Sequence, residues 1–199
     1  MTSFSIVGVA GNITRPSRTS ALVSALLAEI GSLQNAQSRL IELVDVGPYL
    51  FQPFIPERLQ AFSFERLPLE ARSAIQAIEA ADALIVGTPV YKGSYSGALK
   101  HLFDLVRPTA LAEKPILLAA TGGTPLHGLV TEHQLRPLFG FFNAVTLPTT
   151  IFALESDFQN YRIDKPELLS RVSRAAAEMA ELLEAQSIRR RARAALATA

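Results

Sequence analysis

Three short segments of this 199-residue chain combine residue types that suit the binding of a phosphorylated planar ring. The first, residues 11–20, carries hydroxyl side chains and two arginines and leads directly into a predicted helix. Hydroxyls, a guanidinium and free backbone N–H groups at the start of a helix suit a dianionic phosphate. The segment has neither the GxGxxG pattern of dinucleotide-binding folds nor the pattern of a P-loop. Ordinary N-capping of the helix by Ser17 or Thr19 would explain the hydroxyls equally well.

The second and third segments, residues 88–97 and 120–124, follow two further predicted strands. In the second, Tyr91 and Tyr95 offer apolar surface with a polar tip, which can line the edge and face of a planar ring. In the third, Gly122 and Gly123 let the backbone approach a ligand closely and donate N–H groups. Each segment could also be an ordinary turn at the end of a sheet. Together the three predict a site for a phosphorylated planar ring with polar edges.

The elements that must position these segments follow from hydrophobic patterning. Short apolar runs at 4–10, 83–88 and 116–120 predict strands buried on both faces, and weaker candidates lie at 38–43 and 144–148. Helical spacing recurs at 19–30, 69–81, 95–106, 126–142 and 166–187; Gly31 is expected to end the first helix and Pro137 to bend the fourth. The alternation predicts an α/β fold, a doubly wound five-stranded parallel sheet with helices on both faces. Ligands of such sheets bind outside the carboxyl ends of the strands, where the three segments lie.

Composition excludes several other classes of protein. With 49% hydrophobic and 19% charged residues the chain is not disordered, and without cysteine it has no disulfides, thiolate metal sites or thiol nucleophiles. Three histidines without HExxH spacing leave little room for a catalytic zinc, and no apolar run is long enough to span a membrane. A net charge of +1 implies no nucleic-acid partner. We expect a cytoplasmic protein with one domain over residues 1–187, an irregular loop at 47–68 and a solvated basic tail over 188–199.

The three segments also carry a family resemblance. GNITRPSRTSAL, TPVYKGSYSGALKHLFDL and LLAATGGTPLHGLVTEHQLRPLF resemble the NAD(P)H-dependent FMN reductases of two-component monooxygenases, above all the alkanesulfonate and methanesulfonate types. The resemblance runs from the first strand to about residue 162. It implies a flavodoxin-like fold that takes hydride from NADH or NADPH and binds FMN weakly, as a substrate. It also implies that FMNH2 passes to a partner monooxygenase, in sulfonate or organosulfur assimilation.

The resemblance assigns site residues by position. It places the FMN phosphate against Thr14, Ser17, Arg18 and Thr19. It places the ribityl chain and isoalloxazine against Pro89, Val90, Tyr91, Lys92, Gly93 and Ser94, and the pyrimidine edge against Thr121, Gly122 and Gly123. No side chain need act as an acid or base, because the hydride passes between two cofactors.

The resemblance further implies a homo-oligomer, a dimer or a tetramer. In this family the helix after the paired glycines can contain a π-bulge at the tetramer interface, and His133 stands where the alkanesulfonate type has a tyrosine. We hypothesise that His133 helps set the tetramer and flavin release; otherwise it is an ordinary exposed helical residue beside Glu132.

Two other functions share these segments. An FMN-bound quinone, azo or chromate reductase would keep its flavin and pass electrons to a second substrate. A flavodoxin-like electron carrier would also hold FMN tightly, but such carriers are usually strongly acidic, and the net charge of +1 argues against one.

Overall fold

The computed structural model describes residues 3–50, 64 and 67–197. Its central sheet is parallel, with the order β2 (Ala36–Glu42), β1 (Phe4–Ala10), β3 (Ala83–Pro89), β4 (Pro115–Gly122) and β5 (Val145–Thr146). β6 (Ile151–Leu154) also pairs with β4, beyond the point where β5 ends, so two short strands share the fifth position. The predicted doubly wound, five-stranded parallel sheet is therefore confirmed, with its last strand interrupted.

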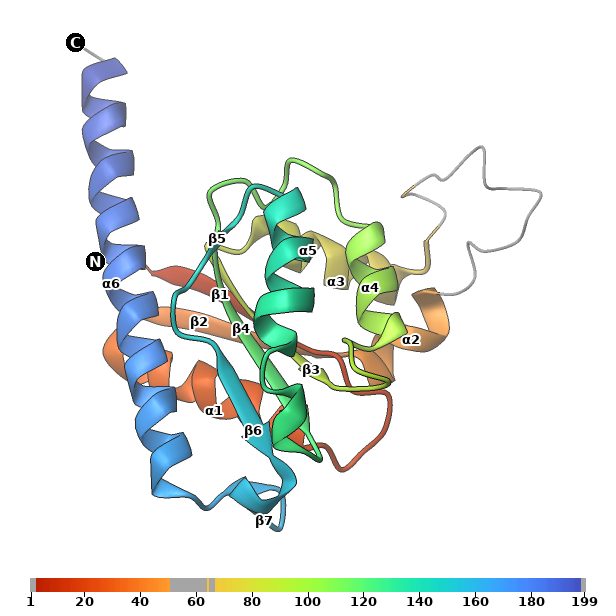
Figure 1. The fold of residues 1–199 in the computed structure, drawn as a ribbon. Coiled ribbons are helices and arrows are strands. Elements are labelled where there is room, and N and C mark those ends of the chain that lie inside the picture. Colours follow the sequence, from red (N-terminus) through yellow and green to blue (C-terminus); the bar gives the residue numbers. More distant parts are fainter. Residues whose placement is uncertain (1–2, 51–63, 65–66, 198–199) are drawn as a thin grey trace.

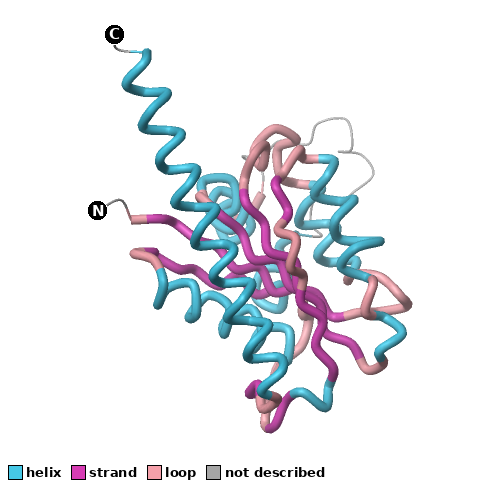
Figure 2. The backbone as a smooth tube through the Cα atoms, turned by 60° about the vertical axis from the view of Figure 1, so that its left-hand side comes forward, coloured by secondary structure: helices cyan, strands magenta, loops and turns pink. Residues whose placement is uncertain are grey.

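Helices cover both faces of the sheet, as Figures 1 and 2 show. On one face lie α1 (Arg18–Leu33) and α6 (Pro166–Ala197). On the other lie α2 (Leu43–Leu50), α3 (Leu69–Ala80), α4 (Gly97–Asp104) and α5 (Arg136–Phe141). The last turns of α6 extend beyond the body of the protein, so residues 188–197 of the predicted tail continue a helix.

The continuous apolar runs of the central strands follow from burial on both faces. In β1, Val7 and Val9 point into the core beneath α3 and α4, while Ile6 and Ala10 point into the core beneath α1 and α6. Because successive side chains of a strand alternate between faces, a strand covered on both sides needs apolar residues at nearly every position.

Two glycines bring α1 unusually close to the sheet. A Cβ atom on Gly8 would lie 2.6 Å from Cγ1 of Val23, and one on Gly87 would lie 2.5 Å from Cγ2 of the same residue. Real Cβ atoms do not approach so closely, so α1 keeps this position only because both strands have glycine there. The close packing fixes the start of α1 at the carboxyl edge of the sheet.

Several sequence-based boundaries need correction. Gly31 does not end α1, which continues to Leu33, and the N–H of Gln34 closes it on the carbonyl of Ile30. The predicted strand 144–148 is only the two residues of β5. The hydrophobic pattern did not predict α2, β6 or a hairpin of β7 (Phe158–Gln159) and β8 (Arg162–Ile163), all of which are short. Part of the predicted loop 47–68 is helical as the end of α2, and residues 51–63 and 65–66 lie outside the described residues.

The predicted helix 126–142 is divided into three parts. A 3₁₀ turn spans Pro125–His127, a π-helical turn spans Thr131–Leu135, and α5 follows at once. Pro137 lies in the first turn of α5, where its missing N–H costs little. The sequence predicts a bend at Pro137, and the structure has a change from π-helix to α-helix directly before this proline.

Among the described residues, no helix combines the length and apolarity that crossing a membrane requires. The same part of the chain has no group of three or more acidic or histidine side chains placed to hold a metal ion.

Candidate functional site

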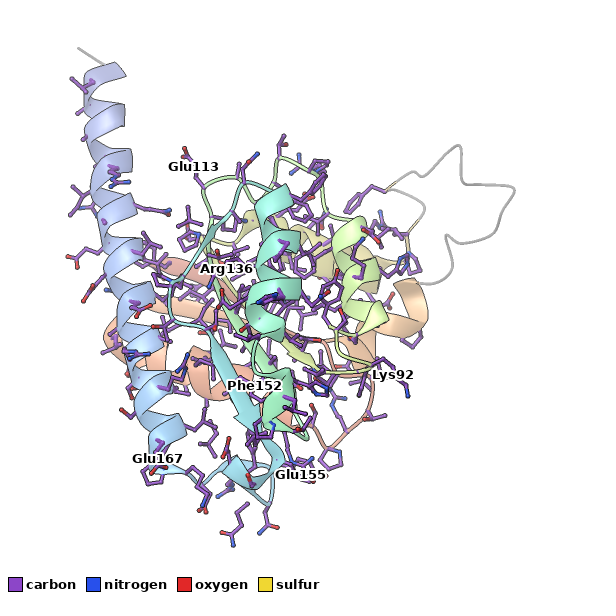
Figure 3. The ribbon with its side chains drawn as sticks, in the orientation of Figure 1. Lys92, Glu113, Arg136, Phe152, Glu155 and Glu167 are labelled. Carbon is purple, nitrogen blue, oxygen red and sulfur yellow. The ribbon has the colours of Figure 1, made fainter. Side chains whose placement is uncertain are left out.

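The three predicted segments meet at the carboxyl edge of the sheet around one pocket of about 230 Å³. The residues that line it are Asn12, Thr14, Pro16, Ser17, Arg18, Thr19, Pro89, Val90, Tyr91, Thr121, Gly122, Gly123 and Glu155. Ten of the thirteen residues expected at the flavin are among them. In Figure 3, Lys92 and Glu155 lie at this end of the molecule, far from Glu113 at the other end.

The first segment ends in a helix start that has no acidic side chain of its own. Ser17 is the N-cap of α1, and its Oγ accepts the N–H of Ser20 at 3.2 Å. Arg18 and Thr19 are the first two helical residues, and the first turn contains no aspartate or glutamate. Ser17 therefore caps the helix and also lines the pocket, so the two explanations of its hydroxyl do not exclude each other.

A network of charged groups holds this segment in place. The Arg15 guanidinium bonds to Glu42, with Nε 3.2 Å from Oε2, and to Asp45, with Nη1 2.8 Å from Oδ1. Asn12 donates from Nδ2 to the carbonyl of Thr14 and to Oε1 of Glu42, each at 3.2 Å. Burial acts to raise the pKa of Glu42. Hydrogen bonds from Arg15, Ser20 and Asn12 outweigh this effect, so the pKa lies below its ordinary value. Arg15 thus positions the segment and is already engaged by two carboxylates.

The second segment is tied to the first through Ser96, the N-cap of α4. Its Oγ donates to the carbonyl of Gly11 at 2.8 Å and accepts the N–H of Leu99 at 3.3 Å, and its own N–H donates to Oγ1 of Thr88 at 3.1 Å. Ser96 is buried, so these bonds are shielded from water. Ser96 was not among the predicted site residues, although a serine directly before an apolar helix is the usual signal of an N-cap.

Three expected contacts of the second segment do not line the pocket. Lys92 and Gly93 form the tip of a tight turn closed by backbone bonds between Tyr91 and Ser94. Gly93 has φ +77°, a conformation that glycine adopts without strain. The Ser94 hydroxyl donates to Oε1 of Gln134 in the π-helical turn at 3.2 Å. The tip of this segment is therefore connected to the π turn through Ser94.

The third segment joins α1 to the sheet and exposes backbone to the pocket. The hydroxyls of Thr121 and Thr19 are 2.6 Å apart and buried. A Cβ on Gly122 would lie 2.9 Å from Cζ of Phe152, so this position needs glycine for close packing. A Cβ on Gly123 would meet nothing within 4 Å, and this glycine leaves the backbone open toward the pocket. Gly122 thus allows close packing against Phe152, whereas Gly123 leaves its backbone open to a ligand.

The segment after β6 closes the pocket on the α1 side. Glu155, the first residue of a 3₁₀ turn, forms an ion pair with Arg18. The Arg18 guanidinium carbon also lies 5.3 Å from the centroid of the Tyr161 ring. Glu155 is 137 residues from Arg18 in sequence, and nothing local in the sequence pointed to it. It is one of three lining residues that the sequence analysis missed, with Asn12 and Pro16.

The structure places His133 in the middle of the π-helical turn, exposed to solvent. The turn is anchored by its neighbour Glu132, which accepts from Nε of Arg136 at 2.6 Å and from the Thr150 hydroxyl at 3.0 Å. The bond from Arg136 is the main reason that the pKa of Glu132 lies below its ordinary value.

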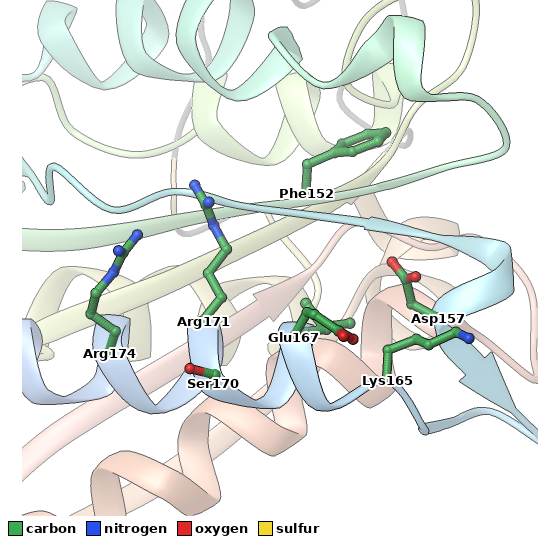
Figure 4. A pocket seen from close by; sticks show the side chains of 8 residues that line it. Phe152, Asp157, Lys165, Glu167, Ser170, Arg171 and Arg174 are labelled. Atoms are coloured by element: carbon green, nitrogen blue, oxygen red, sulfur yellow. The ribbon is translucent and has the colours of Figure 1, made fainter.

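A second, larger pocket of about 610 Å³ lies between β6 and α6 (Figure 4). Arg171 and Arg174 extend from α6 toward β6, and Nε of Arg171 donates to the carbonyl of Thr150 at 2.7 Å. Acidic side chains, Asp157 and Glu167, line the same pocket. None of the expected flavin contacts lines it, so its size does not make it the candidate site.

Comparison with known proteins agrees with this geometry. The sequence model of the NADPH-dependent FMN reductase family matches residues 4–159, from β1 to β7. The chain belongs to this family. The family segment contains all three loops of the pocket, while the whole of α6 lies outside it.

Individual relatives extend over most of the chain. It is 49% identical over 188 residues to the FMN reductase (NADPH) of Pseudomonas aeruginosa, covering 94% of this chain and 97% of that protein. It is also 49% identical over 177 residues to the NADH-dependent FMN reductase SfnF of Pseudomonas fluorescens, covering 89% and 90%. Among solved structures, the apo form of the NADH:FMN oxidoreductase EmoB has a TM-score of 0.76 and 28% identity, covering 92% of this chain and 89% of that one.

The residues of the pocket fit the chemistry of FMN. Hydroxyls, a helix start and Arg18 suit the phosphate, and the open backbone at Gly123 suits hydrogen bonding to the polar edge of the ring. The buried Oδ1 of Asn12 has no hydrogen-bond partner within the described residues, so a buried acceptor at this pocket is still available to a ligand.

Proposed function

We propose that this protein transfers hydride from NADH or NADPH to FMN, with FMN bound in the pocket at the carboxyl edge of the sheet. The observation that supports this most directly is the meeting of the three loops, with ten of the thirteen expected flavin contacts around one pocket. FMN bound there supplies the hydride-accepting chemistry, and the protein supplies binding and orientation.

The chain's own residues divide this work by position. Thr14, Ser17, Arg18 and Thr19 bind the phosphate at the start of α1. Pro89, Val90 and Tyr91 line the ribityl chain and one side of the ring, while Thr121, Gly122 and Gly123 meet the pyrimidine edge. Lys92, Gly93 and Ser94, which the resemblance also places at the ribityl chain and isoalloxazine, form the tip of the second loop, and the Ser94 hydroxyl bonds this tip to the π turn. No lining residue need transfer a proton.

FMN is proposed to act as a diffusing substrate whose reduced form is released to a partner monooxygenase, as the sequence resemblance implies for sulfonate or organosulfur assimilation. The size of the pocket supports weak binding. Sites that enclose a ligand of drug size usually measure about 300–1,000 Å³, and this one measures about 230 Å³. A flavin would extend out of it, toward solvent or toward another subunit.

The apolar surface beside the pocket supports a homo-oligomer. Leu126 is 91% exposed and Leu129 64% exposed, next to the π turn that holds His133, and Tyr91 on the pocket rim is 46% exposed. Large apolar side chains gathered at one place are typical of protein interfaces. We propose that a second copy covers this surface in a dimer or tetramer and that His133 contributes to it. Sedimentation of the protein lacking His133 tests this, and unchanged oligomeric state, flavin retention and turnover would contradict it.

Two further proposals concern the chain as a whole. We propose that residues 1–187 form the reductase domain and 188–199 a dispensable basic tail, so that a chain ending at 187 keeps its turnover. We also propose that the enzyme acts in the cytoplasm. Fractionation of cells that produce the full chain tests the location.

Arg18→Ala tests the assignment of the pocket. We expect the KM for FMN to rise roughly tenfold or more, because a charge-assisted bond to phosphate is lost. The KM for riboflavin, which has no phosphate, should change little. Arg107→Ala is the matched control, since its exposed guanidinium pairs with Glu79 away from the pocket. Equal loss with FMN and riboflavin would contradict phosphate binding at Arg18.

A further inference from the structure

The described residues that line the pocket include few charged side chains, and these are in contact with each other. Of its described lining residues, Arg18 is the only lysine or arginine and Glu155 the only aspartate or glutamate. These two residues form an ion pair across the pocket. The cation expected to bind a flavin phosphate is therefore already in contact with a carboxylate.

The fold holds Glu155 at this position. It follows β6 directly and begins a 3₁₀ turn, which the Asp157 carboxylate closes by accepting the N–H of Leu154 at 2.7 Å. Downstream, Tyr161 lies in the turn of the β7–β8 hairpin with its ring 5.3 Å from the Arg18 guanidinium carbon. The segment after β6 thus brings both a carboxylate and an aromatic ring to Arg18.

The neighbouring arginine cannot take over the role of Arg18. Arg15 bonds through its guanidinium to both Glu42 and Asp45, which hold it against β2 and α2. A phosphate at the start of α1 therefore depends on Arg18, the same guanidinium that Glu155 contacts.

We propose that Glu155 is a built-in competitor of the FMN phosphate, which lowers the affinity for flavin and speeds its release. The proposal rests on the proposed function, because it assumes that FMN binds in this pocket. A guanidinium donates bidentate bonds to either a carboxylate or a phosphate, and a carboxylate beside a phosphate dianion repels it. The Glu155 side chain is 66% exposed, so it can move into water when a phosphate arrives without a large desolvation cost. Glu155 therefore weakens binding without preventing it.

This competition acts on the phosphate and not on the ring. Reduction of the ring leaves the phosphate unchanged, so Glu155 should weaken binding of FMN and FMNH2 alike. Such an arrangement favours an enzyme that must release its reduced flavin on every turnover over one that retains its cofactor.

The test compares Glu155→Gln with the wild-type protein in binding FMN and riboflavin, followed by quenching of flavin fluorescence. We expect the variant to bind FMN up to about fivefold more tightly, the upper end for an exposed charged contact. Riboflavin affinity should stay within about twofold. Asp104→Asn is the matched control: it also removes one negative charge from an exposed ion pair, with Lys100, and should leave both affinities unchanged.

A second measurement needs no flavin. Inorganic phosphate should raise the Tm of Glu155→Gln more than that of the wild-type protein, because at a given concentration a ligand that binds the folded state more tightly stabilises it more. Unchanged FMN affinity in a variant that still reduces FMN would overturn the competition and leave the proposed function intact. Equal tightening of FMN and riboflavin would also overturn it. A wild-type protein that binds no FMN would overturn both.

Discussion

Replacing Gly87 with alanine should move α1 away from the sheet and weaken flavin binding. The added Cβ would lie 2.5 Å from Cγ2 of Val23 and 3.2 Å from Cγ2 of Thr19. Carbon atoms pack at about 3.5–4.0 Å, so the helix must shift by roughly 1 Å. Overpacking of this kind costs about 1–3 kcal/mol. For a chain of this size we expect a fall in Tm of roughly 3–10 °C.

The shift should reach the site because Arg18 and Thr19 begin the same helix. We expect the affinity for FMN to fall by roughly tenfold, because displacing binding groups by 1 Å weakens the contacts that they make. Thermal unfolding followed by circular dichroism and a flavin fluorescence titration measure the two effects.

Gly31→Ala is the matched control in the same helix. A Cβ there meets nothing within 4 Å, and α1 continues past this residue to Leu33. Alanine in place of glycine inside a helix should therefore stabilise the protein, by about 0.5–1 kcal/mol, and leave FMN affinity unchanged. If Gly87→Ala unfolds at the wild-type Tm and binds FMN normally, our explanation of how α1 is positioned is wrong.

Three further predictions concern polar contacts around the site. Ser96→Ala should destabilise the protein by about 1–3 kcal/mol, because it leaves buried partners unpaired, and denaturant unfolding measures this. Thr121→Val should lower the Tm, because the buried Thr19 hydroxyl loses its partner at 2.6 Å, and an unchanged Tm would contradict that role. Arg136 lowers the pKa of Glu132 in the folded state. The ionised Glu132 therefore stabilises the fold fully above the ordinary glutamate pKa, and this stabilisation is lost as the pH falls through the lower pKa of the folded state. Glu132→Gln should accordingly show a smaller loss of Tm between pH 6 and pH 3 than the wild-type protein, and parallel curves would refute this.

The central strands and the loops after them were predictable because their signals are local. A strand buried on both faces is a continuous apolar run, and the glycines and hydroxyls that follow it stand next to it in the sequence. The helix 126–142 was only partly predictable, because its apolar spacing persists through the π turn at Thr131–Leu135.

The remaining features depend on contacts between distant segments. Glu155 reaches Arg18 across 137 residues, and β6 is a four-residue strand identified by its pairing with β4. Arg15 and Arg18 stand three positions apart in one loop. Arg15 is paired with Glu42 and Asp45, whereas Arg18 lines the pocket beside its partner Glu155. Nothing in the local sequence distinguishes these two arginines.

The most direct test of the proposed function is anaerobic oxidation of NADH or NADPH by flavin-free protein while FMN is added in increasing amounts. Flavin that acts as a diffusing substrate should be reduced far beyond one equivalent per subunit, with free FMNH2 accumulating in solution. Reduction that stops at one bound equivalent, and resumes only when a quinone or an azo dye is added, would contradict this account. The protein would then be a reductase that retains its flavin and passes electrons to a second substrate.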